Sequence, residues 1–310
     1  MKNEIAGDPI SGMRWTRKAT KKISAELLSL GIRVNPRTVG RLLKKMKFSL
    51  KTNRKNIISG GKRKPGYRRK RNRQFLNMNE IRTQCTNSGV PIISVDTKKK
   101  EDLGNFKNKG STWCREASEV HDHDFKSDAN GKAVPYGIYD VTKNRGHVIV
   151  GKSRDTPAFA TDAIEEWWRT DGRRQYPTAK KLLILADCGG SNGARSRVWK
   201  KDIQEKLCNK HKIKITVCHY PPGSSKWNPI EHRLFSQISR NWAGVPLKDY
   251  DTVLNYVRTT TTSTGLKVKA SLNNKTYEKG EKVSNDDFEK INCKHADTLP
   301  EWNYTIAPLK

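Results

Sequence analysis

The chain has 310 residues, with 62 Lys or Arg against 31 Asp or Glu and a formal net charge of +31. Such an excess makes a polyanion, most often nucleic acid, the expected partner. No run approaches the ~20 apolar residues of a membrane span, and the N-terminus lacks the apolar core of a secretory signal. The six cysteines show no CxxC spacing, so we expect reduced thiols in a cytoplasmic, nucleoid-associated protein without a membrane partner.

Residues 1–58 are predicted to form an all-α helix-turn-helix module. A first apolar helical face is followed by Gly31, in the position of a C-terminal glycine, and a second helix begins with Asn35 as N-cap and Pro36 in the first turn. The second helix is basic on its outer face, which favours DNA binding over the alternative of a plain helical hairpin. The two apolar faces are formed by Ile23, Leu27 and Leu30, and by Val39, Leu42, Leu43 and Met46.

Residues 59–88 are predicted to be a basic linker that lies along phosphates, the alternative being a solvated linker that binds nothing specific. The first 75 residues hold 23 Lys or Arg and only three Asp or Glu, so positive charge is concentrated at this end of the chain. Arg37 and Arg41 are the candidates for reading bases. The full set of predicted DNA-binding residues is Arg37, Arg41, Lys44, Lys45, Arg54, Lys55, Arg68, Arg69 and Arg71.

Residues 89–245 read as an α/β domain, and residues 246–310 as a C-terminal extension. An apolar strand over 90–96 is followed by a hairpin of strands over 135–140 and 146–151. Helix, strand, helix, strand and helix then follow, with the later strands over 182–187 and 213–219. This order matches a ribonuclease-H-like fold, a mixed five-stranded sheet flanked by helices.

Three acids fall where that fold places its catalytic carboxylates. Asp96 ends the first strand, Asp187 ends the fourth, and Glu231 lies in the first turn of the last helix. Phosphodiester cleavage needs an in-line nucleophile and a charge sink for the leaving oxygen, which two Mg²⁺ ions provide, and Mg²⁺ prefers carboxylate oxygens. We therefore expect Asp96 to bridge two metal ions and the other two acids to flank them.

Each acid also has a plainer interpretation. Asp187 alone could be a turn or cap residue, and Glu231 alone a surface acid at a helix N-terminus. The cluster from His121 to Asp124 has no further spaced ligands, so we interpret it as a polar loop rather than a zinc site. The glycine-rich turn at 189–193 lacks the Lys-Ser/Thr of an ATP-binding loop, which argues against an ATPase.

Three blocks of sequence carry a resemblance to a known family. They are SVDTKKKE with GNFKN (94–101 and 104–108), ADCGGSNG (186–193) and PPGSSKWNPIEHRLFS (221–236). Together they resemble bacterial insertion-sequence transposases of the DDE type, the Rhodopirellula-type (ISAzo-type) family, and Asn-Pro-Ile-Glu is also similar to Tc/mariner-like transposases. Family members usually carry further N-terminal sequence, so the resemblance implies a shortened copy that begins near Gly7.

The resemblance implies a DNA transposase whose acidic triad falls on Asp96, Asp187 and Glu231. It implies two Mg²⁺ ions per site, with Mn²⁺ able to substitute, and double-stranded DNA, element ends and target, as the partner. A homodimer or higher oligomer assembled on DNA is expected. Two alternatives stay open: a ribonuclease-H-like nuclease or resolvase without strand transfer, and an inactive DNA-binding remnant.

Overall fold

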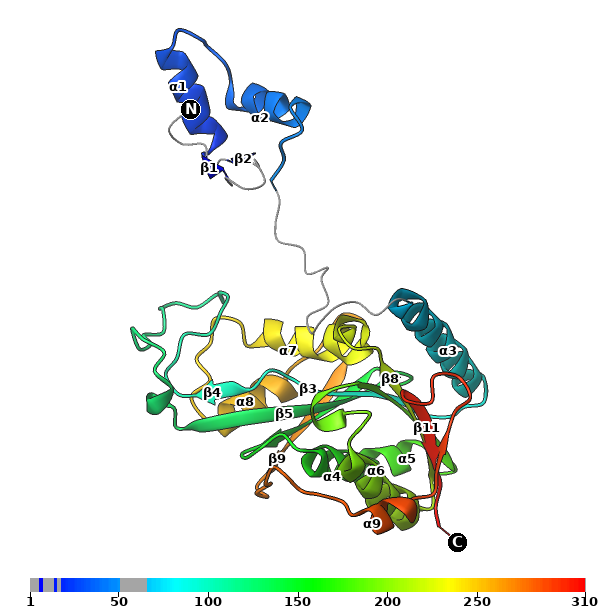
Figure 1. Cartoon of the computed structure of the whole chain (residues 1–310). Coiled ribbons are helices and arrows are strands. Elements are labelled where there is room, and N and C mark those ends of the chain that lie inside the picture. The colour runs from blue at the N-terminus through cyan, green and yellow to red at the C-terminus, as the bar shows by residue number, and fades with distance from the viewer. Residues whose placement is uncertain (1–5, 8–13, 16–17, 51–65, 310) are drawn as a thin grey trace. The chain divides into compact units, whose positions relative to one another are not determined.

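The computed structural model describes residues 6–7, 14–15, 18–50 and 66–309 (Figure 1). The chain forms two compact units, Met1–Gly60 and Gly61–Lys310. The division falls two residues after the end of the predicted DNA-binding module. No helix in the described ranges is long and apolar enough to cross a membrane.

The N-terminal unit contains the two predicted helices. Strands β1 (Ala6–Gly7) and β2 (Arg14–Trp15) pair antiparallel, and α1 (Thr20–Ser29) and α2 (Pro36–Lys45) follow. The Asn35 side chain accepts a hydrogen bond of 2.8 Å from the Arg37 amide, so the predicted N-cap of α2 is confirmed. Gly31 has a φ of +81°, the left-handed backbone that ends α1 and that glycine adopts without strain.

The apolar faces of these helices are only partly buried. Ile23 on α1 and Val39 on α2 are buried, as the periodicity predicts, and the two helices contact each other. Leu30, Leu42 and Met46, which were expected on the same faces, are exposed by 74%, 46% and 65%. Two helices of ten residues each offer too little surface to cover both stripes, because each helix can bury only the side that meets the other.

The predicted linker is corrected by the structure. Tyr67–Asn87 forms a 21-residue helix, α3, within the larger unit. Met78 on this helix is buried against Tyr220 and Ile92 of the sheet, and Gln74 is also fully buried. Basic composition suggested a solvated segment, but the charged residues occupy one side of the helix and the other side packs.

The larger unit is built on a mixed sheet. Its central order is β6-β5-β3-β7-β8, in which β3 lies antiparallel to β5 and parallel to β7. This is the expected ribonuclease-H-like arrangement, since the first strand lies beside the fourth. The strands are β3 (Ile92–Thr97), β4 (Glu101–Leu103), β5 (Gly131–Asp140), β6 (Arg145–Gly151), β7 (Lys181–Asp187), β8 (Lys214–Tyr220), β9 (Lys267–Asn273), β10 (Cys293–His295) and β11 (Asn303–Ile306).

Helices cover both faces of this sheet (Figure 1). One face packs against α4 (Pro157–Trp167) and α6 (Arg197–Asp202), each followed by a π-helical turn, and the short helix α5 (Arg173–Gln175) follows the first of these turns. The other face packs against α3, α7 (Ser236–Asn241) and α8 (Tyr250–Arg258). The short helix α9 (Asn285–Glu289) lies beside α6.

Residues 246–310 contribute strands to the same sheet rather than forming an appended extension. Strand β9 pairs parallel with β6 at one end of the central strands, and β11 pairs antiparallel with β8 at the other end. In the described part of the chain the sheet therefore has nine strands, where five were predicted. Strands β6 and β8 would otherwise be exposed edges, so these residues complete their backbone hydrogen bonding.

Candidate active site

Two of the predicted acids lie side by side because of the sheet register. Strands β3 and β7 are parallel, and Val95 pairs with Ala186. Asp96 and Asp187 are the next residue on each strand. Carboxyl ends of adjacent parallel strands meet at one edge of a sheet, where loops are free to present side chains to a ligand. The predicted neighbourhood of Asp96 and Asp187 is therefore present.

Glu231 lies close to the same edge because the strand beneath its helix has a glycine, which has no side chain, at the point of contact. On β5, Gly137 pairs with Asp96. A Cβ atom on Gly137 would lie 2.5 Å from the Phe235 ring and 2.9 Å from Ile230. Only glycine therefore lets this helical segment lie so close to the strand. The close packing brings Glu231 within hydrogen-bonding reach of Asp96.

Asn228 ties the three sequence blocks together. Its side-chain amide donates to the carbonyl of Val95 at 3.2 Å and to Oδ1 of Asp187 at 3.3 Å. Its side-chain oxygen accepts from the hydroxyl of Ser94, which itself accepts a 3.0 Å bond from the Ile230 amide. Ser94 and Asn228 are fully buried, so this cluster fixes β3, β7 and the start of the helical segment Glu231–Asn241 relative to one another.

A second buried chain of hydrogen bonds supports Asp187 from behind. His219 bonds the Asp187 carbonyl through Nδ1 at 2.8 Å and the Tyr304 hydroxyl through Nε2 at 3.0 Å. Burial lowers the pKa of His219 to about 4, so the ring is neutral, with Nδ1 donating and Nε2 accepting. Trp199 donates to the same hydroxyl at 2.8 Å. The C-terminal strand that carries Tyr304 thus supports the site.

Three acidic side chains are crowded together at this edge, and the pKa of each is raised. Burial, and then the charge of Asp187, raises the pKa of Asp96 to about 8. Burial also raises the pKa of Asp187 to about 6, and the pKa of Glu231 is raised chiefly for the same reason. No Lys or Arg among the described residues forms an ion pair with any of the three. The nearby charges of His232 and Lys98 offset only part of the rise in the pKa of Glu231.

The donor set suits a hard divalent cation. All three side chains offer carboxylate oxygens, the ligands that Mg²⁺ and Mn²⁺ prefer. Within the described residues, however, no three His, Cys, Asp or Glu side chains converge as a finished metal-binding group. Asp96 is adjacent to each of the other two acids, but the three do not form a closed cage. The chemistry of the donors fits a metal ion, and their placement gives Asp96 the central position.

A fourth acid, which the sequence interpretation missed, lies beside Asp96. Asp155 accepts a hydrogen bond of 3.0 Å from the Thr97 hydroxyl, which also contacts the Ser191 hydroxyl at 3.2 Å. Lys100 is 3.8 Å from the Asp155 carboxylate. Asp155 follows the hairpin in the sequence, where no pattern marks it, so only the folded chain brings it to the site.

Most of the predicted DNA-binding residues lie on exposed helix surfaces, and two lie outside the described residues. Arg37, Arg41, Lys44 and Lys45 are exposed on α2 and its basic outer face is present. Arg68 and Arg69 are exposed in the first turn of α3, and Arg71 on the same helix is half-buried. Arg54 and Lys55 lie outside the described residues.

The loop from His121 to Asp124 lies in an exposed segment. His123 pairs with Asp122 at 3.2 Å and stacks on Phe125 with ring centroids 5.3 Å apart. This loop, which lies within the described residues, contains no group of three His, Cys, Asp or Glu side chains that could hold a metal ion. Its contacts are those of the polar loop that the sequence suggested.

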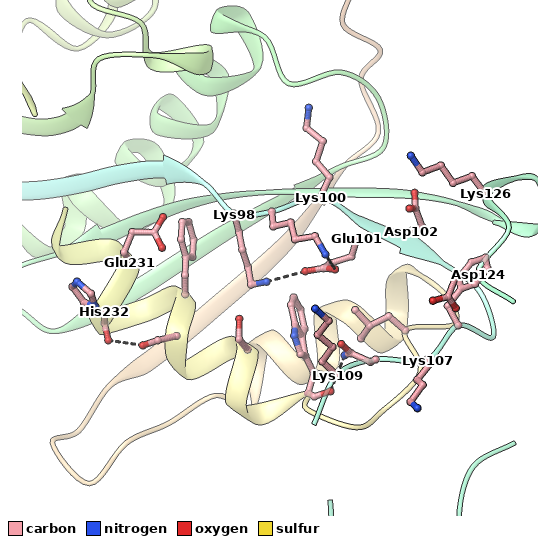
Figure 2. Close-up of a pocket in the computed structure, with 18 of the residues that line it drawn as sticks. Lys98, Lys100, Glu101, Asp102, Lys107, Lys109, Asp124, Lys126, Glu231 and His232 are labelled. Atoms are coloured by element: carbon pink, nitrogen blue, oxygen red, sulfur yellow. Dashed lines mark hydrogen bonds and ion pairs between the residues drawn. The ribbon is translucent and has the colours of Figure 1, made fainter. Parts of the chain in front are cut away.

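A cavity of about 860 Å³ adjoins Glu231 (Figure 2). Seven lysines line it, and the wall opposite Glu231 comes from the loop that follows β4. No sequence signal marked this cavity, because its lysines come from separate segments.

Comparison with known proteins gives the family of the chain. No curated protein matches it by sequence. Among solved structures it is distantly similar to the Mos1 transposase paired-end complex with left transposon end, with 14% identity and a TM-score of 0.48, over 77% of this chain and 65% of that one. It is also similar to the Mos1 strand transfer complex, with 14% identity and a TM-score of 0.49, over 81% and 71%. A family model, the Rhodopirellula transposase DDE domain, matches residues 1–308, so the chain belongs to this family.

Proposed function

We propose that the protein is a DNA transposase that hydrolyses phosphodiester bonds at element ends and joins the freed 3′ hydroxyl to target DNA. The observation that carries the proposal is the juxtaposition of Asp96, Asp187 and Glu231 at one edge of the sheet, in a chain of the transposase DDE-domain family. The solved Mos1 structures include a paired-end complex with the left transposon end and paired-end complexes with Mn and with Mg.

The three carboxylates would hold two Mg²⁺ ions, with Mn²⁺ able to substitute. Bound metal ions supply a polarised water or hydroxyl nucleophile and neutralise charge on the leaving oxygen. Asp96 lies on the strand next to Asp187 and within hydrogen-bonding reach of Glu231, so it would be the ligand shared by both ions, with Asp187 and Glu231 as flanking ligands. Asn228 orients Asp187, since it donates to Oδ1 of that carboxylate.

Double-stranded DNA is the proposed substrate, both element end and target. The exposed basic face of α2 would contact the element end, with Arg37 and Arg41 reaching base edges. Arg54, Lys55, Arg68, Arg69 and Arg71 would add phosphate contacts. We further propose that the protein works as a dimer or larger assembly on DNA, and that it acts on the nucleoid in the cytoplasm.

Strand transfer is the activity that tests the proposal. The purified chain is incubated with Mg²⁺, a plasmid target and a labelled duplex that carries the end of the element flanking its gene, cut to leave a free 3′ hydroxyl. Covalent transfer of label to the plasmid supports a transposase. Nicking of uncut end DNA without transfer would instead identify a nuclease or resolvase, and neither product with Mg²⁺ or Mn²⁺ would identify a DNA-binding remnant.

A further inference from the structure

The lysine-lined cavity beside Glu231 is the feature that the acidic site does not explain. Figure 2 shows Glu231 at one end and Lys107, Asp124 and Lys126 at the other. Seven lysines and four carboxylates line it, so the lining is positively charged. Like charges held together cost free energy unless an anion lies between them. The cavity therefore favours an anionic ligand.

Several of these lysines have side chains that form no ion pair within the described part of the chain. Lys107, Lys109 and Lys126 are exposed, and no carboxylate among the residues that the structure describes forms an ion pair with them. The Lys226 ammonium group lies over the Trp227 ring, 5.4 Å from its centroid. By contrast, Lys98 is buried, donates to Glu101 at 2.9 Å and lies over the Trp242 ring.

The backbone next to Lys107 and Lys109 is held in place by contacts with the chain around Trp242. The Asn108 side chain donates to the Trp242 carbonyl at 2.9 Å, and the Gly244 amide donates to the Lys109 carbonyl at 3.1 Å. Gly110, with a φ of +106°, packs so closely that a Cβ atom there would lie 2.8 Å from Ala243. An anchored loop with unpaired cations is preorganised for an anion, since ordering the loop costs nothing further on binding.

The position of the cavity selects the kind of anion. Lys98, Lys99 and Lys100 directly follow β3, which carries Asp96, so the lysines begin where the acids end. The floor is apolar, formed by Phe106, Trp242 and their neighbours, and sugars or bases can lie on such a surface. Repeated positive charges over an apolar floor suit the phosphates of a polynucleotide strand. The larger unit as a whole has 47 Lys or Arg against 28 Asp or Glu, a net charge of +19.

We propose that this cavity binds the backbone of the DNA strand that runs up to the cleaved bond. It is a second DNA-binding surface, on the catalytic unit, in addition to the basic face of α2. Lys107, Lys109 and Lys126 contact phosphates, and Lys98 holds the floor in position. The inference rests on the proposed transposase function, because it takes the strand to be the substrate of the neighbouring acids.

The test uses the full chain in which Arg37→Ala and Arg41→Ala weaken the contribution of α2. Onto this background are added Lys107→Gln, Lys109→Gln and Lys126→Gln. The matched control instead carries Lys279→Gln, Lys282→Gln and Lys294→Gln, three exposed lysines that likewise have no ion pair to a described residue. A labelled mixed-sequence DNA, single-stranded or duplex, is titrated in EDTA at several salt concentrations.

The cavity variant should lose affinity, and the log–log salt slope should become shallower by about 2 to 3, since each phosphate contact contributes about 0.7 to 0.9. The control should keep the slope of its parent, and Lys→Arg at the three cavity positions should restore it. Circular dichroism checks that each variant is folded. Equal slopes for the cavity and control variants would overturn the inference.

Nicking and strand transfer, measured separately on the wild-type background, distinguish this inference from the proposed function. If the wild-type chain transfers strands, and the cavity variant has a higher KM with an unchanged kcat, both the transposase function and the DNA-binding cavity are supported. If the cavity variant transfers strands with an unchanged KM, the inference that the cavity binds DNA is wrong, while the transposase function is retained. Loss of the salt slope in a protein that neither nicks nor transfers would overturn the proposed function and leave a DNA-binding cavity.

Discussion

At the scale of single residues, the candidate site depends on few side chains. Asp96 and Asp187 share a register position on adjacent strands, and Glu231 reaches them from a helix. Asn228 contributes no acid, yet it forms hydrogen bonds to both strands that carry Asp96 and Asp187. Two kinds of variant test the site: one removes the charge of an acid, and the other removes the hydrogen bond by which Asn228 orients Asp187.

Asp187→Asn should abolish metal-dependent nicking in a protein that still folds and binds DNA. Asparagine is nearly isosteric and keeps hydrogen bonding, but it lacks the charge that a hard cation requires. The loss should reach several orders of magnitude in rate, each factor of ten being about 1.4 kcal/mol of barrier. Asp96→Asn and Glu231→Gln should behave alike. The measurement is nicking of element-end duplex in Mg²⁺ or Mn²⁺.

Asp122→Asn is the control for this series, because Asp122 is 92% exposed in its side chain and lies in the separate polar loop. It should nick at close to the wild-type rate. Wild-type nicking by folded Asp187→Asn would show that the triad is wrongly assigned. Loss of nicking in folded Asp122→Asn would move the metal site toward the loop.

Asn228→Ala should weaken the binding of the metal ions without removing a proposed ligand. The change deletes the donor to Asp187 and leaves the buried Ser94 hydroxyl without its acceptor. Residues that orient metal ligands typically contribute 10–100-fold in affinity or activity. We expect the Mg²⁺ concentration for half-maximal nicking to rise by roughly that factor. Asn72→Ala, exposed on α3, is the control, and an Asn228→Ala protein with unchanged Mg²⁺ dependence would refute the orienting role.

At the scale of elements, segments outside the predicted catalytic core contribute to it. Helix α3 was predicted as linker, but Gln74 on it donates to the His219 carbonyl at 2.9 Å and to Asn303 Oδ1 at 2.8 Å. Asn303 on β11 returns a bond of 2.7 Å to Gln74. The segments before and after the predicted domain therefore meet behind the strand that supports Asp187.

Gln74→Ala should lower the free energy of unfolding of the larger unit by about 1–3 kcal/mol per group left unpaired, because buried polar atoms lose their partners. Gln84→Ala, on the exposed side of the same helix with one long bond to Glu80, should change it by less than about 0.5 kcal/mol. Urea denaturation followed by tryptophan fluorescence measures both. Equal stabilities would mean that α3 does not pack as part of this unit.

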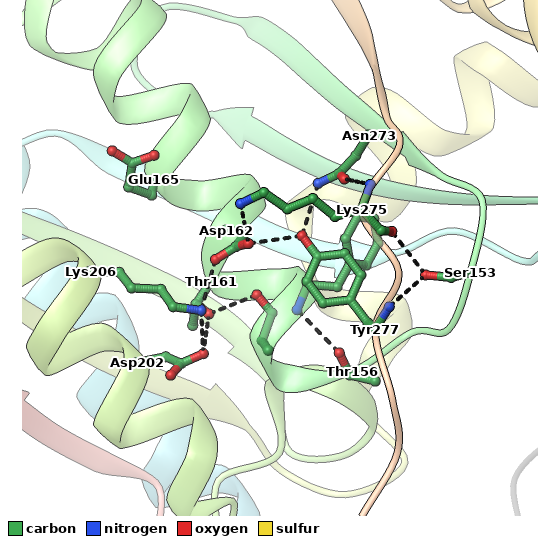
Figure 3. Close-up of polar contacts among 12 residues, drawn as sticks. Ser153, Thr156, Thr161, Asp162, Glu165, Asp202, Lys206, Asn273, Lys275 and Tyr277 are labelled. Atoms are coloured by element: carbon green, nitrogen blue, oxygen red, sulfur yellow. Dashed lines mark hydrogen bonds and ion pairs between the residues drawn. The ribbon is translucent and has the colours of Figure 1, made fainter. Parts of the chain in front are cut away.

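A polar network joins the chain after β9 to the helical layer (Figure 3). Asp162 on α4 accepts a hydrogen bond of 2.8 Å from the Tyr277 hydroxyl and pairs with Lys206 at 2.8 Å and Lys275 at 3.1 Å. Burial alone raises the pKa of Asp162, but the hydrogen bond and charge of Lys206 and the other donors outweigh it, so the pKa is lowered. A lowered pKa means that the network stabilises the charged carboxylate.

Asp162→Asn should therefore destabilise the fold in a pH-dependent way. An unfolded aspartate has a pKa of about 3.9, and the folded value is lower. The stabilisation is complete above the unfolded pKa and disappears as the pH falls through the folded one. We expect a loss of about 1–3 kcal/mol at neutral pH that shrinks toward acid pH.

Thermal unfolding at a series of pH values measures this effect. Asp297→Asn, exposed and without an ion pair to any residue that the structure describes, should match wild type throughout. A pH-independent difference between Asp162→Asn and wild type would show that charge is not the cause.

At the scale of the whole molecule, both compact units are basic. Residues 1–60 hold 15 Lys or Arg against three Asp or Glu, and the larger unit also has an excess of positive charge. The counterions released from DNA on binding give the affinity its salt dependence. Charge sets affinity, while few side chains at base edges set sequence preference.

DNA affinity should fall steeply with salt, with a log–log slope near −0.9 for each phosphate contacted. Arg37→Ala with Arg41→Ala should also lose preference for element-end DNA over unrelated duplex. Lys21→Ala with Lys22→Ala removes the same charge from exposed positions on α1 and should keep that preference. Competition binding at several salt concentrations measures both quantities. A salt-insensitive affinity would contradict phosphate binding.

The sequence by itself determined the local elements and the identity of the acids. Hydrophobic runs ending in Asp96 and Asp187 marked buried strands, and Asn35 with Pro36 marked a helix start, because periodicity and capping depend only on neighbouring residues. The order of elements was enough to place the first strand beside the fourth.

Only the tertiary structure decided which distant segments complete the site. The need for glycine at position 137 is visible only once the helix that packs on it is in place. Asp155 joins the site only because the folded chain brings it next to Thr97. Basic composition concealed the buried side of α3, and strands β9 to β11 lay beyond the recognised pattern. The lysine cavity is likewise assembled from separate segments. Such contacts depend on pairing and packing across long stretches of chain, which local patterns do not encode.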